Sequence, residues 1–215
     1  EQSGWRYNLI EAFDQPWKEK IEGTVGGYWG MFDADRNDKQ ILAGPVSNLP
    51  GWRRWLLLGI GLWLLLQFGS GWCSPVATLI AATGANLSAL HLLHSEIASR
   101  TPYEHCWNLA LAVVAAAVIY AWLRQLAGRA RPRWQESAVL VLAVLACIEM
   151  LGLVFDPRYR EFPVAVFATP AFAIWFMRGG ESDLAARARV LGALLALCVP
   201  VVLVQETVFN AEALG

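Results

Sequence analysis

The run LALAVVAAAVIYAWL at residues 109–123 decides the fold, because it contains no charged side chain and no glycine or proline. A similar run, WLLLGIGLWLLLQF, occupies residues 55–68. A helix needs ~20 mostly apolar residues to cross a bilayer, because the hydrocarbon core is ~30 Å thick and every backbone group must be bonded within the segment. With their flanks, both runs have that length, and they predict membrane-spanning helices.

The composition agrees with a membrane protein. Of the 215 residues, 56% are hydrophobic, and the mean hydropathy is +0.40, whereas soluble domains are ~45–50% apolar. The chain has eleven tryptophans, many of which flank the apolar runs, as expected of anchors at the membrane interface. They are Trp52, Trp55, Trp72, Trp107, Trp122, Trp134 and Trp175.

Charge and cysteine content exclude other classes. The net charge is -1 and the polar N-terminal segment has no basic stripe, so we expect no nucleic-acid partner. The four cysteines lie one per hydrophobic region and lack CxxC spacing. We therefore interpret them as small buried apolar residues, and expect neither a bound metal nor a cofactor.

The apolar pattern predicts an all-α membrane bundle of about six transmembrane helices over residues 51–215. Residues 1–50 form a polar N-terminal arm, which holds all three lysines of the chain. The second predicted span is the most polar and the last two each contain a proline. The spans are predicted at residues 55–72, 75–97, 107–127, 137–155, 162–177 and 188–209.

Arginine positions predict the sidedness, since cytoplasmic loops carry an excess of positive charge. One face of a six-span bundle carries seven arginines, and the other carries five, two of which precede the first span. This bias predicts that the arm and the C-terminus lie outside the cytoplasm. The seven are Arg124, Arg129, Arg131, Arg133, Arg178, Arg187 and Arg189.

The arm reads as a fragment of a soluble fold. Residues 7–13, YNLIEAF, have the composition of a strand, residues 23–32 are rich in glycine and aromatic residues, and residues 33–39 form a polar turn. A single strand and turn cannot bury a core. We therefore expect the chain to be the C-terminal part of a longer protein, since the arm needs further residues to pack against.

Residues 7–39, YNLIEAFDQPWKEKIEGTVGGYWGMFDADRNDK, resemble the end of a glycoside hydrolase family 17 catalytic domain. They are most similar to the bacterial β-1,3-glucan glucanosyltransferase branch, in which a membrane domain follows the barrel. The resemblance implies that residues 1–50 are the last strand and loop of an extracytoplasmic (β/α)8 barrel. It also implies a location in the bacterial inner membrane and a β-glucan oligosaccharide or polysaccharide as partner.

In the family, this strand end and loop line the glucan cleft. The resemblance therefore implies that six residues of this segment bind substrate. Gln15 departs from the family, which commonly has a glutamate at this position. The residues concerned are Glu11, Phe13, Asp14, Gln15, Trp17 and Lys18. The two catalytic glutamates of the family belong to motifs that do not occur here, so we expect no catalytic residue in this chain, and Glu11 is not a nucleophile.

Ionisable residues inside predicted spans are costly and therefore candidates for function. His91, His94, Glu149 and Glu206 are predicted at the outer end of the bundle, which leaves the inner half apolar. Several interpretations stay open: a metal site that adds His105, a vestibule that receives glucan, a proton-coupled pathway, or interfacial side chains bonded to one another and to headgroups.

Two functions of different classes follow. The first is a membrane-anchoring part of an enzyme that hydrolyses or transfers β-1,3-glucan by a retaining mechanism. The second is a six-span transporter or assembly partner, whose arm is only an extracytoplasmic extension.

Overall fold

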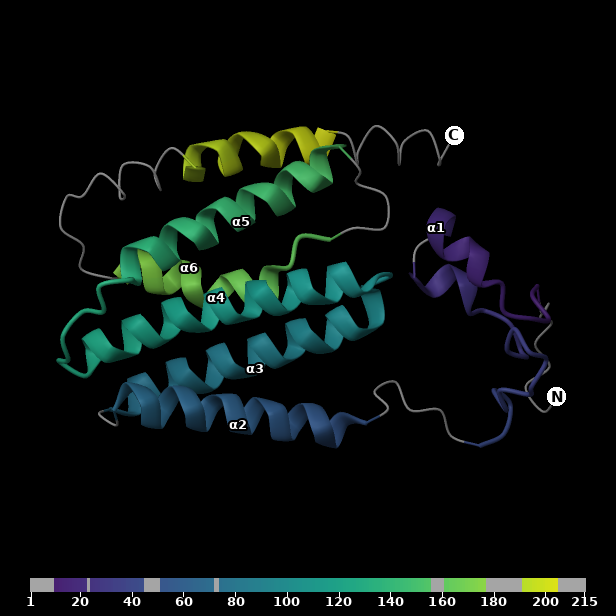
Figure 1. Ribbon diagram of the computed structural model, residues 1–215, viewed down its shortest axis with the longest axis horizontal. Coiled ribbons are helices and arrows are strands. Elements are labelled where there is room, and N and C mark those ends of the chain that lie inside the picture. Colours follow the sequence, from purple (N-terminus) through teal and green to yellow (C-terminus); the bar gives the residue numbers. More distant parts are fainter. Residues whose placement is uncertain are drawn as a thin grey trace, which may run out of the picture.

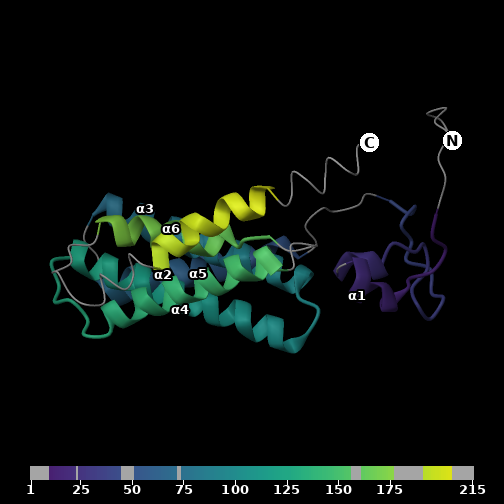
Figure 2. The same cartoon turned by 90° about the horizontal axis from the view of Figure 1, so that it is seen from above.

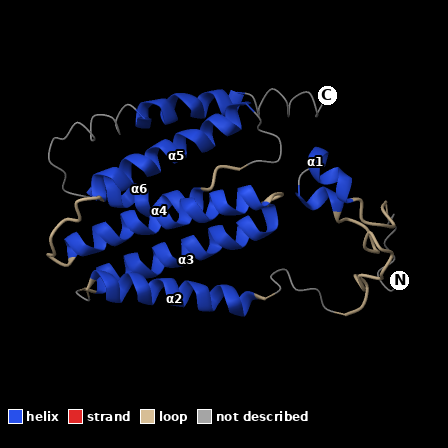
Figure 3. Ribbon diagram, viewed as in Figure 1, coloured by secondary structure: helices blue, strands red, loops and turns tan. Residues whose placement is uncertain are grey.

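The computed structural model describes residues 10–22, 24–44, 51–71, 74–155, 161–176 and 191–204. These residues form a bundle of long helices with the arm at one end (Figures 1 and 2). No strand occurs among them (Figure 3); the arm has only two isolated bridges, Phe13 with Phe32 and Phe32 with Asp38. Of the segment predicted as a strand, the structure describes only residues 10–13, and Phe13 contributes one of these bridges.

The bundle is built from five labelled helices and one further helix. Their bounds are α2 Trp52–Ser70, α3 Pro75–Ala98, α4 Pro102–Leu126, α5 Gln135–Phe155, α6 Val164–Phe176 and Leu191–Val204. Within the described parts, each of the six predicted spans therefore contains a helix. For the first five spans the bounds agree within a few residues, with the exception of the start of α4, and the last predicted span extends at both ends into residues outside the described ones.

The start of α4 shows how local chemistry sets a helix end. The sequence predicts a beginning at Trp107, yet the helix starts at Pro102. The Thr101 side chain accepts a hydrogen bond from the Glu104 N–H, and proline occupies the first helical position. The Glu104 carboxylate lies in the first turn, where the helix dipole places a partial positive charge that favours an anion. Ser74 and Pro75 begin α3 in the same way. A polar cap therefore extends α4 beyond its apolar run.

Three helices, α3, α4 and α5, are long and apolar enough to cross a membrane. This supports a membrane protein with a helical bundle. Helix α2 has 19 residues but carries Arg53 and Arg54 in its first turn. Helix α6 has 13 residues, and at 1.5 Å per residue it is ~20 Å long, shorter than the ~30 Å hydrocarbon core.

Helices α3 and α4 form the centre of the bundle. Small residues line the buried face of α3, among them Ala77, Ala81, Gly84 and Ala85, which lets the neighbouring helices approach closely. Helices α2 and α6 both pack on α3 and α4, and α5 packs on α4. The helix Leu191–Val204 packs on α5, where Cys198 contacts the Met150 and Leu153 cluster.

Successive helices run in opposite directions (Figure 1), so the loops alternate between two ends. We call the end where α2 begins and α3 meets α4 the arm end, because the arm lies there in both views (Figures 1 and 2). The loop 127–134 lies at the opposite end. The arm contains the short helices η1 Pro16–Lys18, α1 Glu19–Glu22 and η2 Thr24–Gly27.

Two sequence interpretations need correction. Cys147 and Cys198 are buried as predicted, but Cys106 is exposed, because the early start of α4 places it near a helix end; Cys73 lies outside the described residues. The end opposite the arm was expected to be apolar. It buries Gln67, Ser70 and Gln135 to within 3% of full burial. Gln135 accepts a hydrogen bond from the Gln125 side chain at 2.8 Å and the Ser70 hydroxyl donates to the Gln67 carbonyl at 3.2 Å, whereas the Gln67 Oε1 has no partner among the described residues.

Candidate functional site

The arm holds a charged pair formed by Glu11 and Lys18. The turn η1 follows Gln15, whose carbonyl accepts from the Lys18 N–H at 2.9 Å, and this turn brings the Lys18 Nζ to the Glu11 Oε1, to which it donates. The hydrogen bond to Glu11 raises the pKa of Lys18 above its ordinary value. Both side chains are largely shielded, with 16% and 11% of the Lys18 and Glu11 side chains exposed.

A second carboxylate, Asp14, ties three segments of the arm together. Its Oδ1 accepts from the Gly30 N–H at 2.9 Å and from the Lys39 Nζ at 2.8 Å. Lys39 also donates to the carbonyl of Tyr28 at 2.8 Å. Asp14 is buried, so this ion pair holds the loops in place and leaves little of the carboxylate for a ligand.

Aromatic rings surround these pairs and face outward. Trp17 is 61% exposed, Trp29 63% and Tyr28 49%. The Lys18 Nζ lies 5.9 Å from the centre of the Trp17 ring, and Phe13 stacks loosely on Phe32 with ring centres 5.6 Å apart. Such large exposed rings on a small extramembrane segment indicate a surface that contacts something else.

The structure brings together some of the predicted arm residues. Glu11, Trp17 and Lys18 lie side by side, whereas Asp14 is engaged by Lys39. Gln15 uses its backbone N–H to bond the Gly27 carbonyl at 2.7 Å. Lys39 was missed as a site residue, because in the sequence it belongs only to a polar turn, 25 residues away from its partner.

The predicted membrane cluster is divided. His91 on α3 is 3% exposed, and its Nε2–H donates to the Asn108 carbonyl of α4 at 3.1 Å. The neighbouring Trp107 donates its indole N–H to the Glu149 Oε1 of α5. Two adjacent residues of α4 thus form hydrogen bonds with two different helices, α3 and α5.

The remaining members behave differently. His94 is exposed on α3, while Glu206 lies outside the described residues. Asn108 extends the network, since its side-chain amide donates to the Ser99 hydroxyl at 3.3 Å and to the Glu104 carbonyl at 3.0 Å. Sequence reasoning missed Trp107 and Asn108 as partners, although their place at the membrane end of an apolar run was a usable signal.

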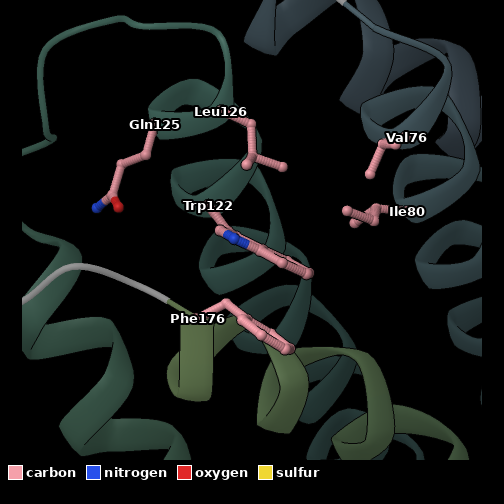
Figure 4. Close-up of a pocket in the computed structure, with 6 residues that line it drawn as sticks. All are labelled: Val76, Ile80, Trp122, Gln125, Leu126 and Phe176. Carbon is pink, nitrogen blue, oxygen red and sulfur yellow. The ribbon is translucent and has the colours of Figure 1, made fainter.

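A cavity of about 640 Å³ lies at the end opposite the arm, between α3, α4 and α6. Figure 4 shows its lining, with Trp122 and Phe176 lying parallel to each other and Val76 and Ile80 facing them from α3. The remaining lining residues are Gln125 and Leu126. Only Gln125 is polar, so the cavity suits an apolar ligand.

The described residues contain no group of three or more His, Cys, Asp or Glu side chains that could hold a metal ion. His91 is instead used as a hydrogen-bond donor between helices. Comparisons of the chain with family models, with curated proteins and with solved structures gave no match.

Proposed function

We propose that the chain is the membrane-anchoring part of a β-1,3-glucan-processing enzyme, in which the arm contributes to the sugar-binding surface. One observation carries the proposal: the exposed rings of Trp17, Tyr28 and Trp29 lie on the same small segment as the Glu11–Lys18 pair. Aromatic rings offer flat apolar surfaces for the C–H faces of sugars, while charged groups bind hydroxyls.

The proposal also includes the barrel, the membrane topology and the position of the catalytic residues. The arm is the end of an extracytoplasmic (β/α)8 barrel, the bundle crosses the bacterial inner membrane six times, and the catalytic glutamates precede residue 1. In a retaining mechanism these glutamates stand ~5–5.5 Å apart and form a glycosyl-enzyme, which water or another sugar resolves. The resemblance of residues 7–39 to glycoside hydrolase family 17 supports this reading.

The test uses the full-length protein with laminarin-type glucan as substrate. Replacing Trp17 by alanine removes one stacking surface, which is worth ~0.5–1.5 kcal/mol for aromatic contacts, so we expect kcat/KM to fall by roughly twofold to tenfold. Trp175→Ala is the matched control, because this tryptophan is 83% exposed but lies on α6. Equal values of kcat/KM for both variants would show that Trp17 of the arm is not part of the sugar-binding surface.

The 215-residue chain by itself is expected not to turn over this glucan, since the proposal places both catalytic carboxylates elsewhere. A gene whose upstream frame lacks Asn-Glu and Glu-Gly-Trp motifs would contradict the enzyme proposal. The second candidate, a transporter or assembly partner, would then be favoured. The polar groups His91 and Glu149 between α3, α4 and α5 are the observation that supports it.

A further inference from the structure

The cavity at the end opposite the arm is an open groove on the surface of the bundle. Its floor is Trp122, which is 7% exposed and stacks on Phe176 with ring centres 6.3 Å apart and planes 8° from parallel. Its rim is open, since Val76 is 63% exposed and Leu126 45%. The volume of about 640 Å³ lies within the ~300–1,000 Å³ of typical ligand sites.

The groove lies on helices that pass through lipid. Helices α3 and α4 both have the length and hydropathy of membrane spans, and Val76 and Leu126 lie near the ends of these helices that face away from the arm. The medium next to such a groove is therefore the hydrocarbon and headgroup boundary of one leaflet. An acyl chain that fills the groove replaces bulk lipid by fixed contacts with the two stacked rings.

Cationic groups lie at the same end of the bundle. The loop that follows Leu126 carries Arg129, Arg131 and Arg133, all exposed, of which Arg131 is paired with Glu136 at 2.6 Å. The backbone N–H of Arg129 donates to the Arg124 carbonyl at 2.9 Å, and none of the ion pairs among the described residues involves its guanidinium. Its guanidinium lies against Gly71, so close that a Cβ there would meet its nitrogen at 2.3 Å.

Arg124 adds a further positive charge in the last turn of α4. Its Nη1 donates to the Tyr120 hydroxyl at 3.5 Å, and its guanidinium lies 5.9 Å from the centre of that ring. Its Nε is buried and has no hydrogen-bond partner among the described residues. Leu126 lines the groove and the loop that follows it carries three exposed arginines, so an apolar groove and cationic groups occur at the same end of the bundle, as the acyl chain and the phosphate of an anionic phospholipid require.

We infer that this groove binds one anionic phospholipid, with an acyl chain between Val76, Ile80 and Trp122 and the phosphate held by Arg129 and its neighbours. The inference does not depend on the sugar-processing proposal. It also explains why polar side chains gather at an end of the bundle that the sequence predicts to be apolar, because a headgroup needs polar surroundings at that depth.

The test measures the apparent dissociation constant of the first bound lipid by native mass spectrometry of the whole chain in detergent. Phosphatidylglycerol and phosphatidylcholine of equal chain length are the probes. One arginine near the headgroup contributes ~1 kcal/mol, so Arg129→Gln should weaken phosphatidylglycerol binding about fivefold. Arg53→Gln, an exposed arginine at the arm end, is the matched control and should leave it unchanged.

The groove itself is tested by filling its mouth. Val76→Trp should weaken phosphatidylglycerol binding, whereas Val113→Trp, at a valine of similar exposure on α4 (60%), should not. Equal melting temperatures show that the variants fold. The inference would be overturned if the protein bound the two lipids with equal affinity, or if the two arginine variants bound phosphatidylglycerol equally well. It would also be overturned if Val76→Trp had no effect, or if excess inorganic phosphate at constant ionic strength released the lipid.

Discussion

At the scale of single residues, carboxylates of the arm act in two ways. Asp14 is buried and holds loops together, whereas Asp33 is partly exposed and shapes a turn. The Asp33 Oδ1 accepts the N–H groups of Asp35 and Asn37 at 2.9 and 2.8 Å, and its Oδ2 accepts from the Asn37 side chain at 2.8 Å. A carboxylate that accepts several hydrogen bonds is favoured in its charged form.

The Asp33 turn should therefore depend on pH. The hydrogen bond from the Asn37 side chain lowers the pKa of Asp33 below its ordinary value of 3.8. A lowered pKa contributes stability that is complete above the unfolded value and is lost as the pH falls through the folded value. We expect the Asn37 amide proton to keep its chemical shift at pH 5 and to shift only below about pH 3.8.

In Asp33→Asn, the same amide should show no titration in this range, since no carboxylate remains there. In the unchanged protein, a chemical-shift change of the Asn37 amide with a midpoint above the ordinary pKa of an aspartate would contradict the expected lowering of the Asp33 pKa. Nuclear magnetic resonance of the amide protons in detergent micelles makes both measurements.

At the scale of elements, α4 joins the bundle through polar side chains as well as apolar packing. The apolar contribution comes from residues such as Leu111, Ala115 and Val118, which are fully buried. The polar contribution comes from Trp107 and Asn108, which bond to α5 and α3. Because lipid tails are as apolar as leucine, hydrogen bonds between helices help to specify which helices pair.

The bond between Trp107 and Glu149 gives a prediction at this scale. Trp107→Phe leaves a half-buried carboxylate without its donor, so we expect a loss of about 1–3 kcal/mol in the free energy of unfolding in detergent. Glu149→Gln should cost less than about 1 kcal/mol, since the amide oxygen still accepts the bond. Thermal unfolding followed by circular dichroism measures both variants.

Trp175→Phe is the control for Trp107→Phe, because Trp175 is an exposed indole on α6. If the two replacements lower stability equally, the hydrogen bond contributes nothing to the packing of α4. If Glu149→Gln preserves folding but impairs glucan handling by intact cells, the network has a role in the vestibule of the proposed enzyme.

At the scale of the whole molecule, the alternating helices place the loops at two ends, and the charges differ between them. The loop 127–134 carries three arginines, whereas the arm end has the Arg54–Glu96 and Arg100–Glu104 ion pairs, at 2.7 and 3.1 Å. The three arginines, of which Arg131 is paired with Glu136, agree with the prediction that the loop 127–134 lies in the cytoplasm.

Reporter fusions test this orientation. A fusion after Gly128 should report a cytoplasmic location and one after Arg100 an external location, because α4 runs between them from one end of the bundle to the other (Figure 1). Opposite signals would reverse the orientation, and equal signals would show that α4 does not cross the membrane. Replacing Arg129, Arg131 and Arg133 by glutamine should weaken the cytoplasmic signal.

The apolar runs of the sequence were sufficient to predict where the helices of the bundle lie, because helix formation depends on residues within a few positions of one another. The start of α3 at Ser74–Pro75 agrees with the predicted beginning at residue 75. The cap at Thr101–Pro102 is a local signal of the same kind, but it was missed, and α4 was predicted to begin at Trp107. The division of the chain into a polar arm and a helical bundle also follows from composition.

Only the tertiary structure decided which polar groups meet. His91 and His94 are three residues apart, yet one is buried against Asn108 and the other is exposed, because the packing of α3 on α4 selects one side of the helix. The pairing of Asp14 with Lys39 and the groove between Val76 and Trp122 also result from the packing of elements distant in the sequence. Such contacts depend on which elements are neighbours, and that is settled by packing over the whole bundle, where no local pattern in the sequence records it.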